Sequence, residues 1–146
     1  MQVVGFNFEK ITAEKKEQAT GKIKINSNIK ITNITEDKVK SFSIEVLKFG
    51  FEFSIEHLSE EDPKKQFGEI VFRGSIILTV DKKQQKEILK DWKSKKIPDS
   101  VRNPVYNIIL SKANLKALQL EEELGLPTHI QMPKIASDQK DKSYTG

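Results

Sequence analysis

The chain has 146 residues, of which 36% are hydrophobic and 32% charged, and its formal net charge is +4. These values are typical of one soluble globular domain that can bury an ordinary hydrophobic core. The absence of cysteine excludes disulfide scaffolds, thiolate metal sites and thiol catalysis. The apolar runs are too short to span a bilayer, and the first residues show no signal-peptide pattern, so we expect a cytoplasmic protein.

Two alternating segments open the chain, and each predicts a half-buried strand. In residues 3–12, one face carries Val4, Phe6 and Phe8. In the second run, one face carries Ile23, Ile25, Ile29 and Ile31, with lysine and asparagine opposite. The charged segment 13–20 between them predicts a loop or an exposed strand end, and residues 35–38, TEDK, predict a turn.

Two longer strands follow. In residues 42–58 the apolar positions change parity between Val46 and Leu47, which is the expected trace of a β-bulge. Residues 67–80 place Gly74 in the middle slot of an apolar face formed by Ile70, Phe72, Ile76, Leu78 and Val80. The opposite face of this segment also carries Val71 and Ile77, so we expect a central strand or one covered on both sides.

Two helices are predicted next. The first has Asp81 as N-cap and Gln84 at the reciprocal position of a capping box, runs to about Lys95, and buries a narrow stripe containing Trp92. A short turn around residues 99–101 follows Pro98. The second helix is expected to begin at Asn103-Pro104 and end at Gly125, so that about 21 residues span roughly 31 Å and cover the strands.

Residues 1–135 are therefore predicted to form a single α+β domain, a four-stranded antiparallel sheet with two C-terminal helices packed on one face. Pro127 and Pro133 favour an extended arm after the second helix. Residues 136–146 are polar and patternless, and we expect them to be a disordered tail.

No catalytic motif is present in the sequence. There is no phosphate-binding glycine loop, and serine has no credible histidine–acid pairing. His57 and His129 lack a second ligand at metal-binding spacing, so both are expected to be surface or partly packed residues. The acidic clusters 60–62 and 121–123 are expected to be solvated charge. The sequence predicts a non-enzyme without a cofactor or metal.

The phenylalanines of the two long strands leave several uses open. Core packing explains most of them, and the remainder suits a subunit interface or a groove for apolar segments. Glu45, Glu52 and Glu56 occupy alternate positions where a stacking platform for nucleic acid would carry cations. Most of the lysines are explained by solubility, and a nucleic-acid surface is the less favoured reading.

The order of four long strands, a helix and a second long helix with a proline-rich end is similar to that of SecB-type export chaperones. The segment 104–110, PVYNIIL, resembles the entry to the helical region of that family, and residues 124–133, LGLPTHIQMP, resemble the family's ending. The ending looks closer still to small archaeal SecB-like proteins. Pro127 and Pro133 match their pattern, whereas Thr128, His129 and Gln131 depart from it.

The resemblance implies a homo-oligomer, dimer or tetramer, that holds unfolded polypeptides in apolar grooves without ATP, in protein export or another chaperone role. The family's zinc-binding tail for the SecA motor cannot exist without cysteine, and its acidic surface is replaced by net positive charge. Our candidates for binding extended clients are Phe51, Phe53, Ile76, Leu78 and Trp92. The alternatives are a non-catalytic subunit of a fixed complex and, less favoured, a basic nucleic-acid binder.

Overall fold

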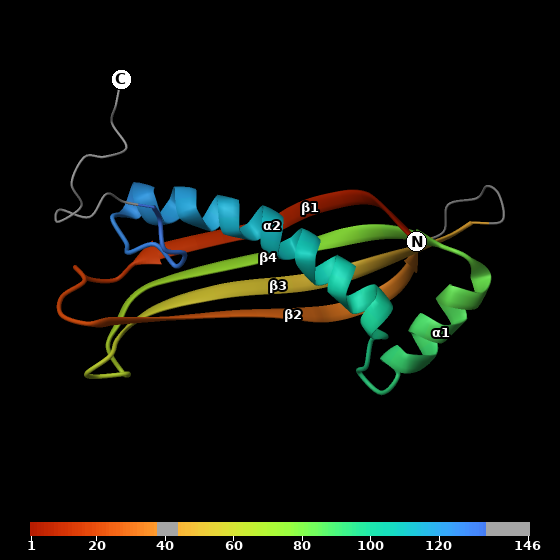
Figure 1. The fold of residues 1–146 in the computed structure, drawn as a ribbon, viewed down its shortest axis with the longest axis horizontal. Helices are drawn as coiled ribbons and strands as arrows, with labels where there is room; N and C mark the ends of the chain where they lie inside the picture. Colours follow the sequence, from red (N-terminus) through yellow and green to blue (C-terminus); the bar gives the residue numbers. More distant parts are fainter. Residues whose placement is uncertain (38–43, 134–146) are drawn as a thin grey trace, which may run out of the picture.

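The structure is a computed structural model that describes residues 1–37 and 44–133. Four long strands, β1 (Gln2–Lys15), β2 (Ile23–Asp37), β3 (Glu45–Ser59) and β4 (Gln66–Val80), precede two helices, α1 (Lys82–Trp92) and α2 (Asp99–Leu124). The strands form one antiparallel sheet in the order β1-β4-β3-β2. The predicted α+β architecture is confirmed, and β4 is central, as its two apolar faces indicated (Figure 1).

Helix α2 lies obliquely across one face of the sheet, and α1 packs at the end of the sheet from which β4 leaves (Figure 1). The core fills the space between α2 and the inner faces of β3 and β4. It contains Phe49, Phe51, Phe53, Phe72, Ile76, Leu78, Val105, Ile109 and Ala113, each at most 1% exposed. Ile88 of α1 joins the same cluster and closes the core at that end.

Gly74 makes room for the aromatic centre of this core. It lies opposite Phe51 in the β3–β4 register, and a Cβ atom on Gly74 would lie 2.7 Å from Phe51 Cζ. The ring of Phe51 therefore rests over the glycine and stacks on Phe6, with ring centroids 5.4 Å apart. Phe53 and Phe72 stack in the same way at 5.9 Å.

Two predictions of strand parity are wrong. The pairing of β1 with β4 shifts between Val3 and Gly5, so that Val4 is an extra residue, turned outward and 56% exposed. The predicted bulge between Val46 and Leu47 is absent, because β3 pairs regularly with both neighbours through these two residues. The parity change there arises because Val46 is an apolar residue on the outer face, whereas Phe42 lies outside the described residues.

Strand β2 is longer than expected, and one of the two alternatives for residues 13–20, an exposed strand end, is confirmed in part. β1 continues to Lys15, so part of the charged segment 13–20 is the end of a strand. β2 continues to Asp37, so the turn predicted at residues 35–38 does not begin at Thr35. Cross-strand pairing with β3 extends through Asp37 and overrides the turn propensity of these polar residues.

The predicted start of α1 is confirmed. The Asp81 carboxylate accepts a hydrogen bond from the Gln84 backbone N–H at 2.7 Å, and the Asp81 N–H donates to Gln84 Oε1 at 3.3 Å. The helix ends at Trp92 rather than near Lys95, because the next residues form a tight turn in which the Lys95 N–H donates to the Trp92 carbonyl at 2.8 Å and Lys95 has a positive φ of 58°.

Helix α2 begins one turn earlier than predicted. The N–H groups of Val101 and Arg102 both donate to the Pro98 carbonyl at 2.9 Å, so the expected separate turn is the first turn of the helix. Pro104 therefore lies inside α2 rather than at its first position. The end is as predicted, since Gly125 has a φ of 65° and the Leu126 N–H donates to the Glu121 carbonyl at 2.8 Å.

The arm after α2 folds back on the body but forms no strand within its described part, residues 126–133. Leu126 is buried against Gly68 at the start of β4. His129 reaches the inner face of the sheet, where its ring lies edge-on to Phe53 with centroids 6.5 Å apart. The prediction of a disordered tail concerns residues 136–146, which lie outside the described residues.

Candidate functional site

The oblique course of α2 leaves a groove beside β2, the edge strand of the sheet. A hollow of about 680 Å³ opens between β2 and the α1–α2 connection. Its apolar lining consists of Ile31 from β2, Trp92 from the end of α1, Ile97 from the connection and Tyr106 from α2. All four side chains are half-buried and pack against the core, so the wall of the hollow is supported from below.

A second, smaller hollow of about 130 Å³ lies further along the same two elements. It is lined by Ser27, Asn28, Ile29, Phe53 and Leu110. Ile29 and Ile31 are two positions apart on β2, and Leu110 is one helical turn beyond Tyr106 on α2. The two hollows are therefore aligned along the β2–α2 seam, a shape that suits an extended segment.

The edge of β2 adds main-chain hydrogen-bonding groups to this seam. β2 pairs with β3 on one side and has no strand neighbour on the other within the described part of the chain. Alternate backbone N–H and C=O groups of such a strand point outward and can pair with an added strand. Lys30, Ile31 and Thr32, which line the larger hollow, all belong to this edge.

The charged residues that line the larger hollow are all cationic: Lys30, Lys95, Lys96 and Arg102. Lys95 Nζ lies over the Trp92 ring, 4.6 Å from its centroid, and the Arg102 guanidinium lies 6.0 Å from that of Tyr106. Trp92 and Tyr106 therefore each have a cation against one face of the ring.

The five residues predicted to bind peptide are divided by the structure. Trp92 lines the larger hollow and Phe53 lines the smaller one, although Phe53 is only 1% exposed. Phe51, Ile76 and Leu78 lie beneath α2 in the core and are at most 1% exposed. Contact of these three with a client would require α2 to move, and that role stays a prediction.

The groove also includes Ile31, Ile97 and Tyr106, which were not among the predicted binding residues. The alternation around Ile31 predicts that it faces the core, and Tyr106 stands out in the sequence only within the segment 104–110. One available signal was the width of the apolar stripe of α2, where Tyr106, Ile108 and Leu110 flank the core positions Val105 and Ile109 and indicate contacts beyond the core.

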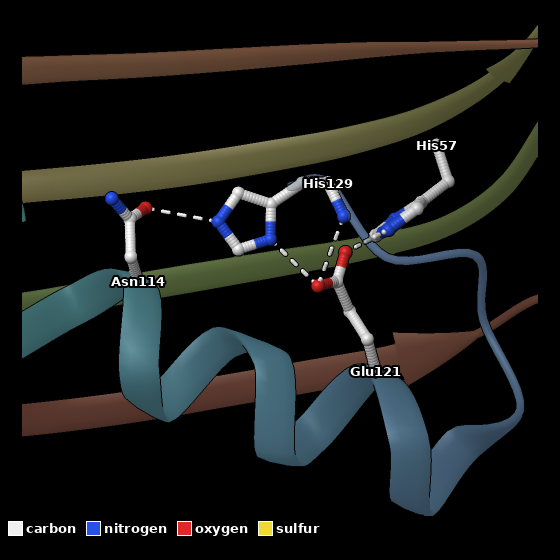
Figure 2. Close-up of polar contacts among 4 residues, drawn as sticks. All are labelled: His57, Asn114, Glu121 and His129. Atoms are coloured by element: carbon white, nitrogen blue, oxygen red, sulfur yellow. Dashed lines mark hydrogen bonds and ion pairs between the residues drawn. The ribbon is translucent and has the colours of Figure 1, made fainter. Parts of the chain in front are cut away.

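A buried polar cluster joins the other end of α2 to the sheet and the arm (Figure 2). Glu121 Oε2 accepts from His57 Nε2 at 2.6 Å, and Glu121 Oε1 accepts from His129 Nδ1 at 2.6 Å and from the His129 backbone N–H at 3.2 Å. His129 Nε2 lies 2.9 Å from Oδ1 of Asn114, which is about two turns before Glu121 on the same helix. His57 and Glu121 are fully buried, and 5% of the His129 side chain is exposed.

The cluster corrects two predictions. His57 is not a surface residue, and Glu121 does not belong to a solvated acidic run, although its neighbours Glu122 and Glu123 are exposed. Burial by itself raises the pKa of Glu121, but the hydrogen bonds from His129 and His57 outweigh it and hold the pKa below its ordinary value. The ionised carboxylate thus holds β3, α2 and the arm together.

The cluster has a structural role, since its hydrogen bonds join β3, α2 and the arm. One carboxylate accepts hydrogen bonds from two rings, and within residues 1–37 and 44–133 no group of three or more potential ligands is placed to hold a metal ion. It is closed to solvent and separate from the groove, whose lining includes none of its four residues.

Neither helix in the described part of the chain is long and apolar enough to cross a membrane.

Comparisons with known proteins find similarity in the fold. No protein-family model and no curated protein matches the sequence. Among solved structures, the chain is similar to the Mycobacterium tuberculosis SecB-like chaperone Rv1957, in complex with a ChAD peptide from the Rv1956 HigA1 antitoxin. The TM-score is 0.56 at 10% identity, over 94% of this chain and 92% of that one, so the SecB-like fold predicted from the sequence is confirmed.

Proposed function

We propose that this SecB-like chain is an ATP-independent chaperone, a holdase that binds unfolded or extended polypeptides along the β2–α2 seam. The observation that carries the proposal is the groove with Ile31, Trp92, Ile97 and Tyr106 in its wall, beside the edge of β2 that has no strand neighbour in the described part of the chain. A peptide-bound chaperone with the same fold supports it. A non-catalytic role follows from the same proposal, because binding and release need no chemical step.

The groove provides two kinds of contact to an extended client. The outward backbone groups of β2 can pair with the client main chain, which depends little on client sequence. Side chains of the client can enter beside Trp92 and Tyr106 in the larger hollow and above Ile29 and Leu110 in the smaller one. Each apolar side chain buried in this way contributes about 1.5–3 kcal/mol, enough for reversible binding of varied segments.

The finer expectations belong to the proposal as well. They include a role in protein export, a cytoplasmic location, assembly into a dimer or tetramer, and a relationship to small archaeal SecB-like proteins. The absence of cysteine means that any contact with an export motor would need a surface other than a zinc-binding tail. Measuring the oligomeric mass in solution tests the assembly directly.

The test is suppression of aggregation of a chemically denatured client at stoichiometric amounts of the protein. Trp92 is the only tryptophan of the chain, so its fluorescence also reports binding at the groove directly. We expect Trp92→Ala and Tyr106→Ala each to weaken client binding at least about tenfold, as removal of an aromatic anchor does. Peptide binding of these variants would be followed by calorimetry, and their folding checked by urea unfolding.

Leu115→Ala is the matched control, because Leu115 is a 64% exposed apolar residue of α2 away from the groove lining. It should leave client binding unchanged. No suppression of aggregation by a well-folded sample at several-fold excess would refute the holdase function. Suppression that survives both groove variants would place the binding surface elsewhere.

The alternative, a subunit of a fixed complex, would use the outer side of α2, where the apolar side chain of Leu115 is 64% exposed. That function predicts one specific complex and no general affinity for unfolded chains. A purification with the tagged chain, followed by the denatured-client assay on the same material, separates the two functions.

A further inference from the structure

We propose that the groove selects acidic clients, namely extended segments in which aspartate or glutamate flanks an aromatic or large aliphatic side chain. This inference rests on the proposed function and adds a substrate class to it. The charge of the groove lining carries it: Lys30, Lys95, Lys96 and Arg102 line the larger hollow, and no carboxylate does.

These cations are only partly neutralised by the protein itself. Lys30 Nζ lies 3.7 Å from Glu52, but Glu52 also receives a hydrogen bond from Arg73 at 3.0 Å. Arg102 pairs at 3.4 Å with Asp99, whose side chain is 80% exposed and freely hydrated. Lys95 and Lys96 have no carboxylate within 4.0 Å in the described part of the chain. The excess positive charge is therefore available to a ligand.

The backbone directs the two unpaired lysines toward the groove. After α1 the chain makes a tight turn in which the Lys95 N–H donates to the Trp92 carbonyl at 2.8 Å and the Lys96 N–H to the Asp91 carbonyl at 3.1 Å. Lys95 takes the left-handed conformation, φ 58°, which glycine adopts more readily than lysine. In this turn its ammonium group lies against Trp92, at the entrance that an apolar anchor would use.

A single-stranded nucleic acid also combines negative charge with rings, but the groove suits a peptide better. Lys95 and Arg102 each lie against a face of the two aromatic rings, which leaves less ring surface for stacked bases. The outward main-chain groups of β2 are complementary to a polypeptide backbone. Acidic side chains on either side of an anchor would then meet Lys30 on one wall and Lys95, Lys96 and Arg102 on the other.

The experiment compares three unstructured peptides of equal length around the same central phenylalanine and leucine pair, with flanking positions all aspartate, all serine or all lysine. Affinity for the full chain is measured by Trp92 fluorescence and by calorimetry at low salt and at about 0.3 M salt. We expect the acidic peptide to bind at least about tenfold more tightly than the basic one, with the serine peptide between them, since each exposed ion pair contributes a few-fold. The difference should shrink at the higher salt.

The double variant Lys95→Gly/Lys96→Gln removes the two unpaired cations while placing glycine where φ is positive. It should lose most of the difference between its affinities for the acidic peptide and for the serine peptide. Lys22→Gln/Lys112→Gln is the charge-matched control, because both lysines are exposed and outside the groove lining. This control variant should keep the preference for the acidic peptide over the serine peptide.

The outcomes separate this inference from the function on which it rests. If none of the three peptides binds, the groove function itself fails. If all three bind with equal affinity, the protein binds peptides but the acidic selectivity is overturned. The selectivity is also overturned if the double variant keeps it, or if a single-stranded oligonucleotide of equal length displaces the acidic peptide at lower concentration than unlabelled peptide does.

Discussion

His57 Nε2 and Glu121 Oε2 lie 2.6 Å apart although 64 positions separate them, and both side chains are fully buried. The contact joins β3 to the last turns of α2. Because the other carboxylate oxygen accepts two hydrogen bonds from His129, the same residue holds the arm. A hydrogen-bonded carboxylate in this position fixes where α2 ends over the sheet and therefore how α2 crosses it.

Glu121→Gln should lower the free energy of unfolding by about 1–3 kcal/mol. The amide offers one acceptor oxygen, so one of the two imidazole N–H donors would face an N–H group in a buried site. Urea unfolding followed by circular dichroism measures the loss. Glu122→Gln, at the exposed neighbouring position, should change the value by less than about 0.5 kcal/mol. Equal effects of the two substitutions would contradict the role of Glu121.

The stability that Glu121 contributes should depend on pH in the acid range. The hydrogen bonds from His129 and His57 outweigh the effect of burial and keep the pKa of Glu121 below its unfolded value. A carboxyl whose pKa is depressed in the folded state contributes its stability above the unfolded value, about 4.3, and loses it as the pH falls from there through the folded pKa. The gap in unfolding free energy between the natural chain and Glu121→Gln should accordingly narrow as the pH is lowered below about 4.3. A gap that stays constant down to low pH would show that ionisation of Glu121 is unimportant.

Gly74→Ala should destabilise the core by about 1–3 kcal/mol or more. The added methyl group would meet the Asn7 backbone carbonyl and would lie 2.7 Å from Phe51 Cζ. Relief of these contacts would require a shift of the paired strand β1 or of the stacked Phe51 ring, and either shift costs packing and hydrogen-bonding energy. Gly5→Ala is a matched control, because its Cβ would meet only Ile77, at 3.2 Å from Cγ1, in a half-buried side chain that can shift by a few tenths of an ångström. Thermal unfolding should rank the two variants clearly, and a similar melting temperature for both would argue against the close packing over Gly74.

Asp81→Ala should lower the unfolding free energy by about 1 kcal/mol, because the first turn of α1 loses the acceptor of its Gln84 N–H. Asp81→Asn should retain most of the stability, since the amide oxygen can accept the same hydrogen bond. Because α1 carries Trp92 into the groove, the alanine variant should also bind client less tightly than the asparagine variant. Indistinguishable unfolding curves for the two variants would rule out a contribution from the cap.

Local signals in the sequence correctly predicted two helix ends, the start of α1 and the end of α2, because each depends only on neighbouring residues. The capping box of Asp81 with Gln84 and the left-handed stop at Gly125 involve contacts within five residues, so their chemistry is visible in a short window. The apolar residues on both faces of β4 likewise predict its central place in the sheet. Where the prediction was wrong, the deciding contact came from elsewhere: the pairing of β1 with β4 turns Val4 outward, and the register of β3 with both neighbours removes the expected bulge at Val46.

The sequence by itself determined the fold class, because periodicity and caps record which face of each element avoids water. The oblique crossing of α2 was decided only in the tertiary structure. That crossing buries Glu121 between two histidines that sequence spacing does not relate, and it brings Trp92 and Tyr106 beside Ile31 at the edge of β2. It also covers Phe51, Ile76 and Leu78, which an isolated strand would expose. The physical reason is that alternation fixes the direction of a side chain relative to its own element, whereas burial depends on the angle at which another element packs on it.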